Sequence, residues 1–434
     1  MTTERRLSGD LPTILGDLAR GPYPDYIDDV LTTTAQLRQR PAWTFPERWL
    51  PMVEIARQPV LAPRLPWRSV AMAMLLMALL LAAVAMFVGS QTRVPAPFGP
   101  ARNGLVAYEA GGDIFTADPV TGEASPILTG PETDVGPRFS LDGTRIVFER
   151  KIDFARGQLY TVRSDGTDLR LLTPEPLTLA PGDYGRAWEK YEFSPDGQAV
   201  LVATLADGVP GIAIAQTDGT GVRHLDVGMA ASEPSFRPPD GAEILFVGRG
   251  SMGRGIFALD PSTADVRTIR ILTPGYDLAG ANWSPDGSRI AYWSWDPTAF
   301  EMTAKTHVVA ADGTGDRELP SPAGAVWDAH STWSNDGTQL FIVRGYTNDY
   351  EDVRGVVLPA DGSSVGVEVA PSGSVETGCC AAWIWSPDDS KLLGRSRALR
   401  GAPVPQVVID VATREANPAL WESASDPTWQ RLAP

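Results

Sequence analysis

The sequence predicts an all-β protein, a seven-bladed β-propeller, preceded by one transmembrane helix and a short helical amino-terminal tail. Three observations predict this fold: two short turn motifs that alternate along most of the chain, and one long apolar run before them. The 434 residues include 42 Gly and 38 Pro, a content typical of a turn-rich folded chain. We divide the chain into a tail (1–68), a membrane span (69–89), a linker (90–100) and the propeller (101–434).

One motif, an aromatic residue followed by a variant of Ser-Pro-Asp-Gly, recurs before apolar segments. Gly adopts the positive φ that a tight turn requires, while Pro and Asp favour the entry of the chain into the turn. The segments that follow, such as RIVFE and RIAYW, alternate or run apolar as β-strands do. Six copies are present: Phe139–Gly143, Phe193–Gly197, Phe236–Gly241, Trp283–Gly287, Trp333–Gly337 and Trp385–Asp389.

A second turn motif alternates strictly with the first. It begins with Asp, continues with sequences such as Gly-Thr-Gly or Pro-Ser-Thr, and follows a short strand such as DIFTA or HVVAA. Its seven copies begin at Asp118, Asp165, Asp218, Asp260, Asp312, Asp361 and Asp410. The two alternating turns predict four-stranded units of about 48 residues, which need neighbours to bury their faces.

The two ends of this region complete one unit. Pro427–Ala433 matches the strand that precedes each first motif, and Gly104–Tyr108 matches the strand that follows it. A propeller closes when one blade takes its inner strand from one terminus and its other three strands from the opposite terminus. The sequence therefore predicts seven blades closed by the terminal strands. Six blades, with one repeat degenerate, is the alternative.

These repeats resemble the TolB-type (WD-like) β-propeller repeats found in TolB and in the propeller domains of prolyl-oligopeptidase relatives. The similarity covers roughly residues 100–434 and lies in the Ser-Pro-Asp-Gly turns and the Asp-Gly-Thr-Gly hairpins. It implies the fold, but propellers host unrelated functions. The chain departs from both relatives: we expect neither the amino-terminal α/β domain of TolB nor a hydrolase domain with a Ser-Asp-His triad.

Residues 69–89 form an apolar run without an ionisable side chain. A helix of that length measures about 31 Å, enough to cross a hydrocarbon core of about 30 Å. Arg57, Arg64 and Arg68 precede the run, whereas only Arg93 and the more distant Arg102 follow it. The positive-inside rule then predicts a single-pass protein of the cell membrane, with a cytoplasmic amino terminus and an extracytoplasmic propeller.

The tail, residues 1–68, predicts two short helices, at about 11–19 and 25–39. Pro24 and three aspartates begin the second helix, and Arg38 and Arg40 end it, which complements the helix dipole. Its apolar residues are too few for an independent core, so the tail is typical of a segment that orders on a partner. The layout resembles that of membrane-bound anti-sigma factors, without the His and Cys residues of the zinc-binding type. A plain anchor extension is the alternative.

The charge and the scarcity of metal-binding residues argue against several functions. A net charge of −16 opposes attraction to phosphate backbones, so we expect no nucleic-acid partner. Two Cys and three His provide little for a metal centre, and we expect neither metal nor cofactor. The two cysteines, Cys379 and Cys380, are adjacent. Outside the cytoplasm they could close a strained vicinal disulfide, or they could stay reduced as small apolar side chains.

No catalytic residues are evident, and we predict that the protein is not an enzyme. Gly362–Gly366 matches G-x-S-x-G around Ser364, but it occupies a hairpin position and not the strand-to-helix turn that a nucleophile elbow needs. His224, His307 and His330 fall in different blades, and no nucleophile–base pair is apparent. Only His330 is suggestive, because we expect it in a loop that leads into an inner strand.

The loops that lead into the inner strands should rim one mouth of the central channel, and each contains an acidic residue. The candidate ligand-binding residues are Asp134, Glu189, Glu233, Asp277, Asp328, His330, Glu376, Trp383 and Asp426. Carboxylates held close together favour a cation, an amine or a basic peptide. The alternative is that each acid belongs to its repeat and caps a turn, while Trp188, Trp327 and Trp383 fill the space between blades.

The expected function is binding by the propeller, without catalysis. We expect an extracytoplasmic protein, peptide or glycan as the ligand, bound chiefly at this channel mouth. The alternative is a transmembrane sensor, in which binding is relayed through residues 1–68 to a cytoplasmic regulator such as a sigma factor.

Overall fold

The computed structural model describes thirteen segments of the chain. These are residues 71–72, 74–77, 98–153, 156–179, 191–206, 209–250, 253–299, 301, 303–349, 351–370, 383–395, 406–421 and 427–433. The chain divides into two units, Met1–Val88 and Gly89–Pro434, and every described strand belongs to the second.

The amino-terminal unit is described only at residues 71–72 and 74–77, which are helical. The predicted helices of the tail and the rest of the predicted membrane span lie outside the described residues. Among the residues that are described, no helix has the length and apolar character needed to cross a membrane.

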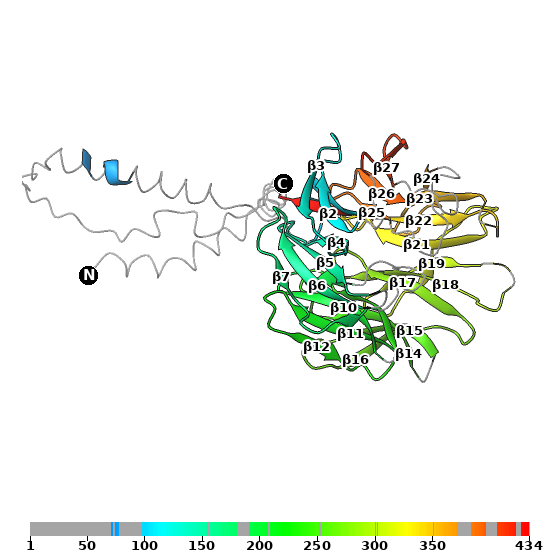
Figure 1. The fold of residues 1–434 in the computed structure, drawn as a ribbon. Helices are drawn as coiled ribbons and strands as arrows, with labels where there is room; N and C mark the ends of the chain where they lie inside the picture. The colour runs from blue at the N-terminus through cyan, green and yellow to red at the C-terminus, as the bar shows by residue number, and fades with distance from the viewer. Residues whose placement is uncertain are drawn as a thin grey trace, which may run out of the picture. The chain divides into compact units, whose positions relative to one another are not determined.

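The second unit consists of seven antiparallel sheets arranged around a centre (Figure 1). We number these blades from the sheet that contains β1. Blade 1 contains β29 (Thr428–Leu432), β1 (Arg102–Ala110), β2 (Asp113–Ala117) and β3 (Ala124–Leu128); blade 2 contains β4 (Asp134–Phe139), β5 (Arg145–Lys151), β6 (Arg156–Arg163), β7 (Arg170–Leu171) and β8 (Leu177–Thr178); blade 3 contains β9 (Tyr191–Phe193), β10 (Ala199–Ala206), β11 (Val209–Gln216) and β12 (Val222–Leu225).

The remaining four blades repeat the same order of strands. Blade 4 contains β13 (Ala231–Phe236), β14 (Ile244–Gly250), β15 (Gly253–Leu259) and β16 (Val266–Ile271); blade 5 contains β17 (Asp277–Trp283), β18 (Arg289–Trp295), β19 (Lys305–Ala310) and β20 (Arg317–Glu318); blade 6 contains β21 (Trp327–Trp333), β22 (Gln339–Gly345), β23 (Val353–Pro359) and β24 (Val367–Ala370); blade 7 contains β25 (Ile384–Trp385), β26 (Lys391–Arg395), β27 (Gln406–Asp410) and β28 (Ala416–Pro418). Seven blades are confirmed, and the alternative of six is wrong.

The ring is closed by strands from the two ends of the propeller. β29 pairs with β1 in antiparallel register, with Trp429 opposite Val106 and Thr428 opposite Ala107. Arg102 Nε also donates a hydrogen bond of 2.6 Å to the carbonyl oxygen of Ala433. In Figure 1 the red carboxyl-terminal strand accordingly lies beside the cyan amino-terminal strands. The predicted closure of blade 1 is confirmed.

The first turn motif joins the inner strand of a blade to its second strand, and its hydrogen bonds explain its composition. In blade 2, Ser140 Oγ donates to Asp142 at 2.5 Å and accepts the backbone N–H of Arg145 at 2.9 Å. Gly143 has a φ of 70°, which is the left-handed region where Gly carries no steric cost. The same Ser–Asp contact recurs at Ser194, Ser284, Ser334 and Ser386.

The second turn motif joins the third and fourth strands of each blade. In blade 3 the carboxylate of Asp218 accepts the backbone N–H of Thr220 at 2.9 Å and its hydroxyl at 2.7 Å. These hydrogen bonds hold the pKa of Asp218 below its ordinary value. The segment around Ser364 is one of these turns, because it lies between β23 and β24, as its hairpin position in the sequence predicted.

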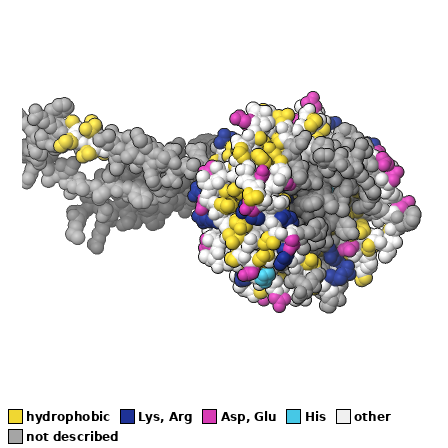
Figure 2. Space-filling view, in the orientation of Figure 1, with side chains coloured by type: hydrophobic (Ala, Val, Ile, Leu, Met, Phe, Trp, Pro, Cys, Tyr) yellow, Lys and Arg dark blue, Asp and Glu magenta, His cyan; other side chains and the backbone are white. Residues whose placement is uncertain are grey.

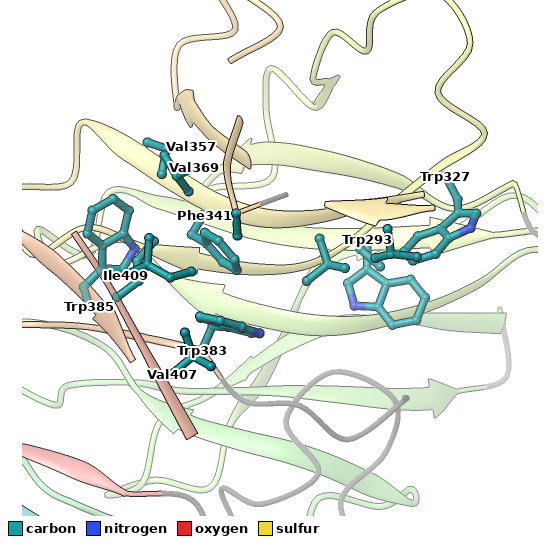
Figure 3. Close-up of a cluster of buried hydrophobic side chains, with 14 of the residues drawn as sticks. Trp293, Trp327, Phe341, Val357, Val369, Trp383, Trp385, Val407 and Ile409 are labelled. Atoms are coloured by element: carbon teal, nitrogen blue, oxygen red, sulfur yellow. The ribbon is translucent and has the colours of Figure 1, made fainter. Parts of the chain in front are cut away.

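The core occupies the spaces between neighbouring blades. One large cluster joins blades 5, 6 and 7, and Figure 3 shows its aromatic members Trp293, Trp327, Phe341, Trp383 and Trp385, which are at most 6% exposed. Two glycines leave room for the indoles. A Cβ at Gly345 would lie 2.0 Å from Trp327, and a Cβ at Gly394 would lie 2.3 Å from Trp383.

One contact between blades departs from the repeat. Asn335 in blade 6 stands where most first motifs have Pro, and Asp389 in blade 7 stands where the others have Gly. Asp389 has a φ of 61°, and its carboxylate accepts the backbone and side-chain N–H groups of Asn335 at 2.7 Å and the N–H of Asp336 at 3.0 Å. Burial raises the pKa of Asp389. Arg431 of β29 donates to Asn335 at 2.8 Å, so the two exceptions link blades 6, 7 and 1.

Replacing Asp389 with Gly restores the common motif but removes its hydrogen bonds to blade 6. We expect Asp389→Gly to lower the free energy of unfolding by about 2 kcal/mol, because the lost bonds to a carboxylate outweigh the relief of a left-handed backbone. The double variant Asn335→Pro/Asp389→Gly should be less destabilised than the sum of the single variants by at least about 1 kcal/mol. Denaturant unfolding of the four proteins measures this cycle, and additive single effects would contradict the coupling.

Candidate functional site

The inner strands of the blades define two channel mouths. β29, β4, β9, β13, β17, β21 and β25 are the innermost strands, and each begins its blade in the same direction. Their amino ends therefore rim one mouth, which we call the amino-end mouth. Their carboxyl ends, followed by the first turn motif, rim the opposite mouth, the carboxyl-end mouth. The residues predicted to bind ligand belong to the first of these.

The predicted acidic residues do not share one structural position. Asp134 and Asp328 lie five residues before the repeated aromatic, Glu233 lies three before it, and Asp277 lies six before it. All four belong to inner strands and not to the loops before them, as does His330. Glu189, Glu376, Asp426 and the pair Cys379–Cys380 lie outside the described residues, so their prediction stays a prediction.

Two of these carboxylates form equivalent ion pairs within their blades. Asp134 lies opposite Arg150, with Nε–Oδ1 and Nη2–Oδ2 distances of 2.7 Å. Asp328 lies opposite Arg344, at 2.6 and 2.8 Å, and these two side chains are only 1% and 2% exposed. Because each acid faces a bidentate arginine, its charge is largely neutralised inside the blade. The arrangement stabilises the blade and leaves little charge for a ligand.

A third acidic residue is paired across a blade boundary. Asp277 of blade 5 lies 3.0 Å from Nε of Arg254 and 3.9 Å from Nη2 of Arg249, both from blade 4. In Figure 2 acidic and basic side chains are interspersed over the coloured part of the visible face. The structure therefore favours charge compensation, and not a field of one sign, around the described acids.

A bulge recurs in the inner strands at a position that needs a left-handed backbone. The register of the strand with its neighbour shifts in β4, β13, β17 and β21. The residue within the bulge has a positive φ in all four strands: Gly136 (65°), Glu233 (54°), Gly280 (67°) and His330 (58°). Two blades thus place a bulky polar side chain where two others have glycine, at a cost of about 1–2 kcal/mol per residue.

Glu233 has an internal role at this position. Its Oε2 accepts the backbone N–H of Gly280 at 2.7 Å, and the side chain is buried. Glu233 and Gly280 occupy the same bulge in neighbouring blades, so the bond ties blade 4 to blade 5. This contact accounts for the left-handed glutamate by packing and hydrogen bonding within the ring.

His330 makes no comparable hydrogen bond to a neighbouring blade within the described residues. Within the described part of the chain its imidazole makes no side-chain hydrogen bond, and its ring centroid lies 5.6 Å from that of Trp293. The side chain keeps partial exposure, yet protein surrounds it closely enough that burial lowers its pKa to about 4. His330 is therefore neutral at physiological pH and can both donate and accept a hydrogen bond.

The aromatic residues near His330 divide into a core set and a partly exposed one. Trp327 and Trp383 belong to the buried cluster of Figure 3, which agrees with the filling of space between blades. Trp295 is partly exposed and stacks on Trp293 with centroids 4.6 Å apart. Trp295 lies opposite Asp277, at the amino end of β17. His330, Trp293 and Trp295 therefore form an aromatic row that leads to the amino-end mouth.

Blade 5 contains a contact between a nucleophile and a base that the sequence did not reveal. Ser294 Oγ lies 3.2 Å from His307 Nε2, and His307 Nδ1 lies 3.6 Å from Asp316 Oδ1, the order of contacts in a serine-hydrolase triad. The signal was hidden because the three residues come from β18, β19 and the turn before β20. Both oxygens of Asp316 are already engaged, by Tyr292 OH at 2.8 Å and Arg270 at 2.9 Å.

Other features of this triad-like group oppose catalysis. Ser294 is 9% exposed and lies within a strand, whereas a nucleophile elbow projects its serine from a strained turn. The imidazole of His307 stacks on the ring of Tyr292, with centroids 4.9 Å apart. We interpret the group as a packing and hydrogen-bonding network between blades 4 and 5.

This interpretation predicts that Ser294 does not react with a fluorophosphonate probe. The hydroxyl is buried, so the reagent does not reach it. Mass spectrometry of the treated chain, with a known serine hydrolase treated in parallel, measures the labelling. Labelling of Ser294 that disappears in His307→Ala would overturn the interpretation.

A cavity at the carboxyl-end mouth was not predicted. It has a volume of about 210 Å³ and is lined by the carboxyl ends of β4, β9, β13 and β17. Phe139, Phe193, Phe236 and Trp283, the aromatics of the first motif, form part of its wall. Arg138, Glu192 and Ser235 add polar groups, and each directly precedes one of these aromatics. In the sequence these three residues occupy the variable position directly before each repeated aromatic, and this pattern is the one that could have indicated the cavity.

Comparison with known proteins supports the fold. No family model matches the chain. An uncharacterized protein of Agrobacterium fabrum is 24% identical over 214 residues, 47% of this chain and 68% of that protein. An oligogalacturonate lyase of Vibrio parahaemolyticus has a TM-score of 0.52 at 16% identity, covering 74% of this chain and 95% of the lyase. TolB of Acinetobacter baumannii has a TM-score of 0.45 at 14% identity, covering 78% and 68%.

The propeller domain of the Trilobed protease of Pyrococcus furiosus is a further structural neighbour. Its TM-score is 0.51 at 12% identity, covering 76% of this chain and 97% of that domain, and it is described as having an open velcro topology. The present ring is instead closed by β29 and β1. The chain is thus a seven-bladed β-propeller, and because this fold hosts unrelated functions it does not decide whether the chain is an enzyme.

Proposed function

We propose that the chain is a single-pass membrane protein whose extracytoplasmic propeller binds a protein, peptide or glycan without catalysis. The ligand contacts the amino-end mouth at His330 and Trp295, and the buried Trp293 packs against both of them. A second role, relay of this binding through residues 1–68 to a cytoplasmic regulator, is the alternative that the layout of the tail favours.

The observation that carries the binding proposal is the positive φ of His330, 58°. A left-handed non-glycine residue is unfavourable, and glycine occupies the same bulge in blades 2 and 5 without that cost. Asp389 and Glu233 offset a similar cost by hydrogen bonds within the ring. The imidazole of His330 has no comparable bond within the described residues. We therefore infer that the imidazole contacts a ligand.

The chemistry around His330 indicates what kind of group it binds. The nearby described carboxylates of Asp277 and Asp328 face arginines, so these two acids do not offer a concentrated negative charge. A neutral imidazole beside two stacked indoles favours a flat or apolar group that also forms a hydrogen bond. Aromatic side chains of a protein or peptide and the rings of a glycan have this chemistry.

The membrane proposal rests on the apolar run at residues 69–89 and on the residues described within it. Residues 71–72 and 74–77 are helical. The side chains of Met72, Met74, Leu75, Leu76 and Met77 are 60–66% exposed. A helix that exposes apolar side chains around its circumference is unfavourable in water and suited to lipid.

Substitution of His330 by Gly separates binding from stability. We expect His330→Gly to bind the ligand at least tenfold more weakly and to unfold no more easily than the parent, because glycine relieves the left-handed backbone. Peptide and glycan arrays probed with the full chain identify ligands, and interferometry measures their affinities.

Ala264→Gly is the matched control for this substitution. Ala264 has a φ of 63° in the outer turn between β15 and β16, so its replacement relieves the same strain far from the channel mouth. This variant should bind as the parent does. Equal affinity of His330→Gly and the parent, or the absence of any ligand on both kinds of array, would contradict the binding proposal.

The membrane proposal predicts that the full chain stays with the membrane fraction during alkaline carbonate extraction. Deletion of residues 69–89 should release the chain, because no other apolar run of that length is present. Protease added to intact cells should reach the propeller but not residues 1–68. Release of the full chain by carbonate would contradict membrane insertion. Reproducible absence of a cytoplasmic partner for residues 1–68 in a pull-down would favour a plain anchor over a sensor.

A further inference from the structure

The cavity at the carboxyl-end mouth lies where a repeated contact between blades is missing. In blade 6, Trp333 Nε1 donates a hydrogen bond of 3.2 Å to the backbone carbonyl of Asn282 in blade 5. In blade 7, Trp385 Nε1 donates one of 3.2 Å to the carbonyl of Thr332 in blade 6. Each acceptor is the residue directly before the repeated aromatic of the preceding blade. These indoles therefore tie adjacent inner strands together.

Trp283 of blade 5 does not make the equivalent bond. Its acceptor would be the carbonyl of Ser235, directly before Phe236 in blade 4, yet its buried indole nitrogen has no hydrogen-bond partner among the described residues. Trp283 and Ser235 are 6% and 5% exposed, and both line the cavity. Trp429 also lacks a partner, but it does not line this cavity. The cavity thus occupies the place of the missing contact between blades 4 and 5.

The turn after β13 contributes to the same wall. The first motif of blade 4 reads Phe-Arg-Pro-Pro-Asp-Gly and is one residue longer than the others, and its Pro238 lines the cavity. The four repeated aromatics of the wall are nearly buried, so most of the wall is preformed, and Phe98, from the segment before β1, adds a partly exposed ring. Its volume of about 210 Å³ is below the roughly 300–1,000 Å³ typical of sites for drug-sized molecules, so it suits a single ring.

The polar groups of the wall indicate a neutral ligand with both donors and acceptors. Arg138 and Glu192 contribute opposite charges, so their sum favours neither an anion nor a cation. Trp283 N–H can only donate and the Ser235 hydroxyl can both donate and accept, whereas Glu192 Oε1 already accepts the backbone N–H of Phe236. The flanking rings of Phe139, Phe193 and Phe236 favour a flat apolar face.

We propose that this cavity binds one neutral sugar residue, whose ring face lies against the aromatic wall and one of whose oxygens accepts the N–H of Trp283. A sugar ring combines a C–H face with hydroxyl groups that donate and accept, which matches the mixed wall. The site lies at the carboxyl-end mouth, whereas the row of His330, Trp293 and Trp295 leads to the amino-end mouth. It stands whether or not the amino-end mouth binds a ligand.

The test uses the full chain and a panel of methyl glycosides of neutral hexoses, with saturation-transfer NMR and titration as readouts. At least one glycoside should bind the parent chain. Trp283→Phe keeps an aromatic ring but removes the N–H, so it should weaken that binding about tenfold or more. It also removes buried ring volume, but it should lower Tm less than Trp333→Phe does, since no internal hydrogen bond is lost. Ser235→Val, which adds an apolar side chain to the wall, should also abolish binding.

Trp333→Phe is the matched control. It removes the same N–H from a position where the indole ties two blades, so it should lower Tm and leave sugar binding unchanged. The proposal is overturned if no neutral glycoside binds, if zwitterionic amino acids bind more tightly than every glycoside, or if Trp283→Phe binds the sugar as the parent does. A loss of Tm in Trp283→Phe equal to that in Trp333→Phe would also overturn it.

Discussion

The pairing of β29 with β1 is the constraint on which the rest of the propeller depends. A four-stranded blade buries its faces only between two neighbours, and a ring is the arrangement in which every blade has both. The bond between Arg102 and Ala433 joins residues 331 positions apart and turns a row of seven sheets into that ring. The indole bonds of Trp333 and Trp385, and the contact of Asp389 with Asn335, then hold adjacent blades at the spacing that closure sets.

Much of the fold follows from turn chemistry that is local in the sequence. The Ser–Asp contact of the first motif and the Asp contact of the second each lie within five residues, so their composition alone predicts them. The terminal strands were found because they complete the same pattern. Local chemistry therefore predicted the number of blades and the closure of blade 1.

The candidate site was less accessible to sequence reasoning, because its contacts join distant strands. Arg150 and Arg344 neutralise their acids through cross-strand register, and the partners of Asp277 come from another blade. The left-handed bulge that includes His330 depends on a register shift, and no residue type in the sequence predicts that shift. The cavity beside Trp283 arises from a contact that is absent, and a sequence pattern can only show contacts that recur.

Three non-glycine residues share a left-handed backbone but differ in the contacts of their side chains. Asp389 and Glu233 use their carboxylates to accept N–H groups from an adjacent blade, so their unfavourable conformation contributes to the ring. His330 occupies the same bulge as Glu233 but directs its side chain to no such bond within the described residues. A departure from the repeat therefore stabilises the ring only where its side chain forms a hydrogen bond within the ring.

Closure by the last strand also determines the order in which the blades can fold during synthesis. Blade 1 lacks its inner strand until residues 428–432 have been synthesised, so blades 2 to 7 can form in sequence while the ring stays open. Bringing together strands that are more than 300 residues apart is a slow, entropically unfavourable step, and it comes last. During that interval the exposed faces of the first and last blades are the surfaces most in need of protection from aggregation.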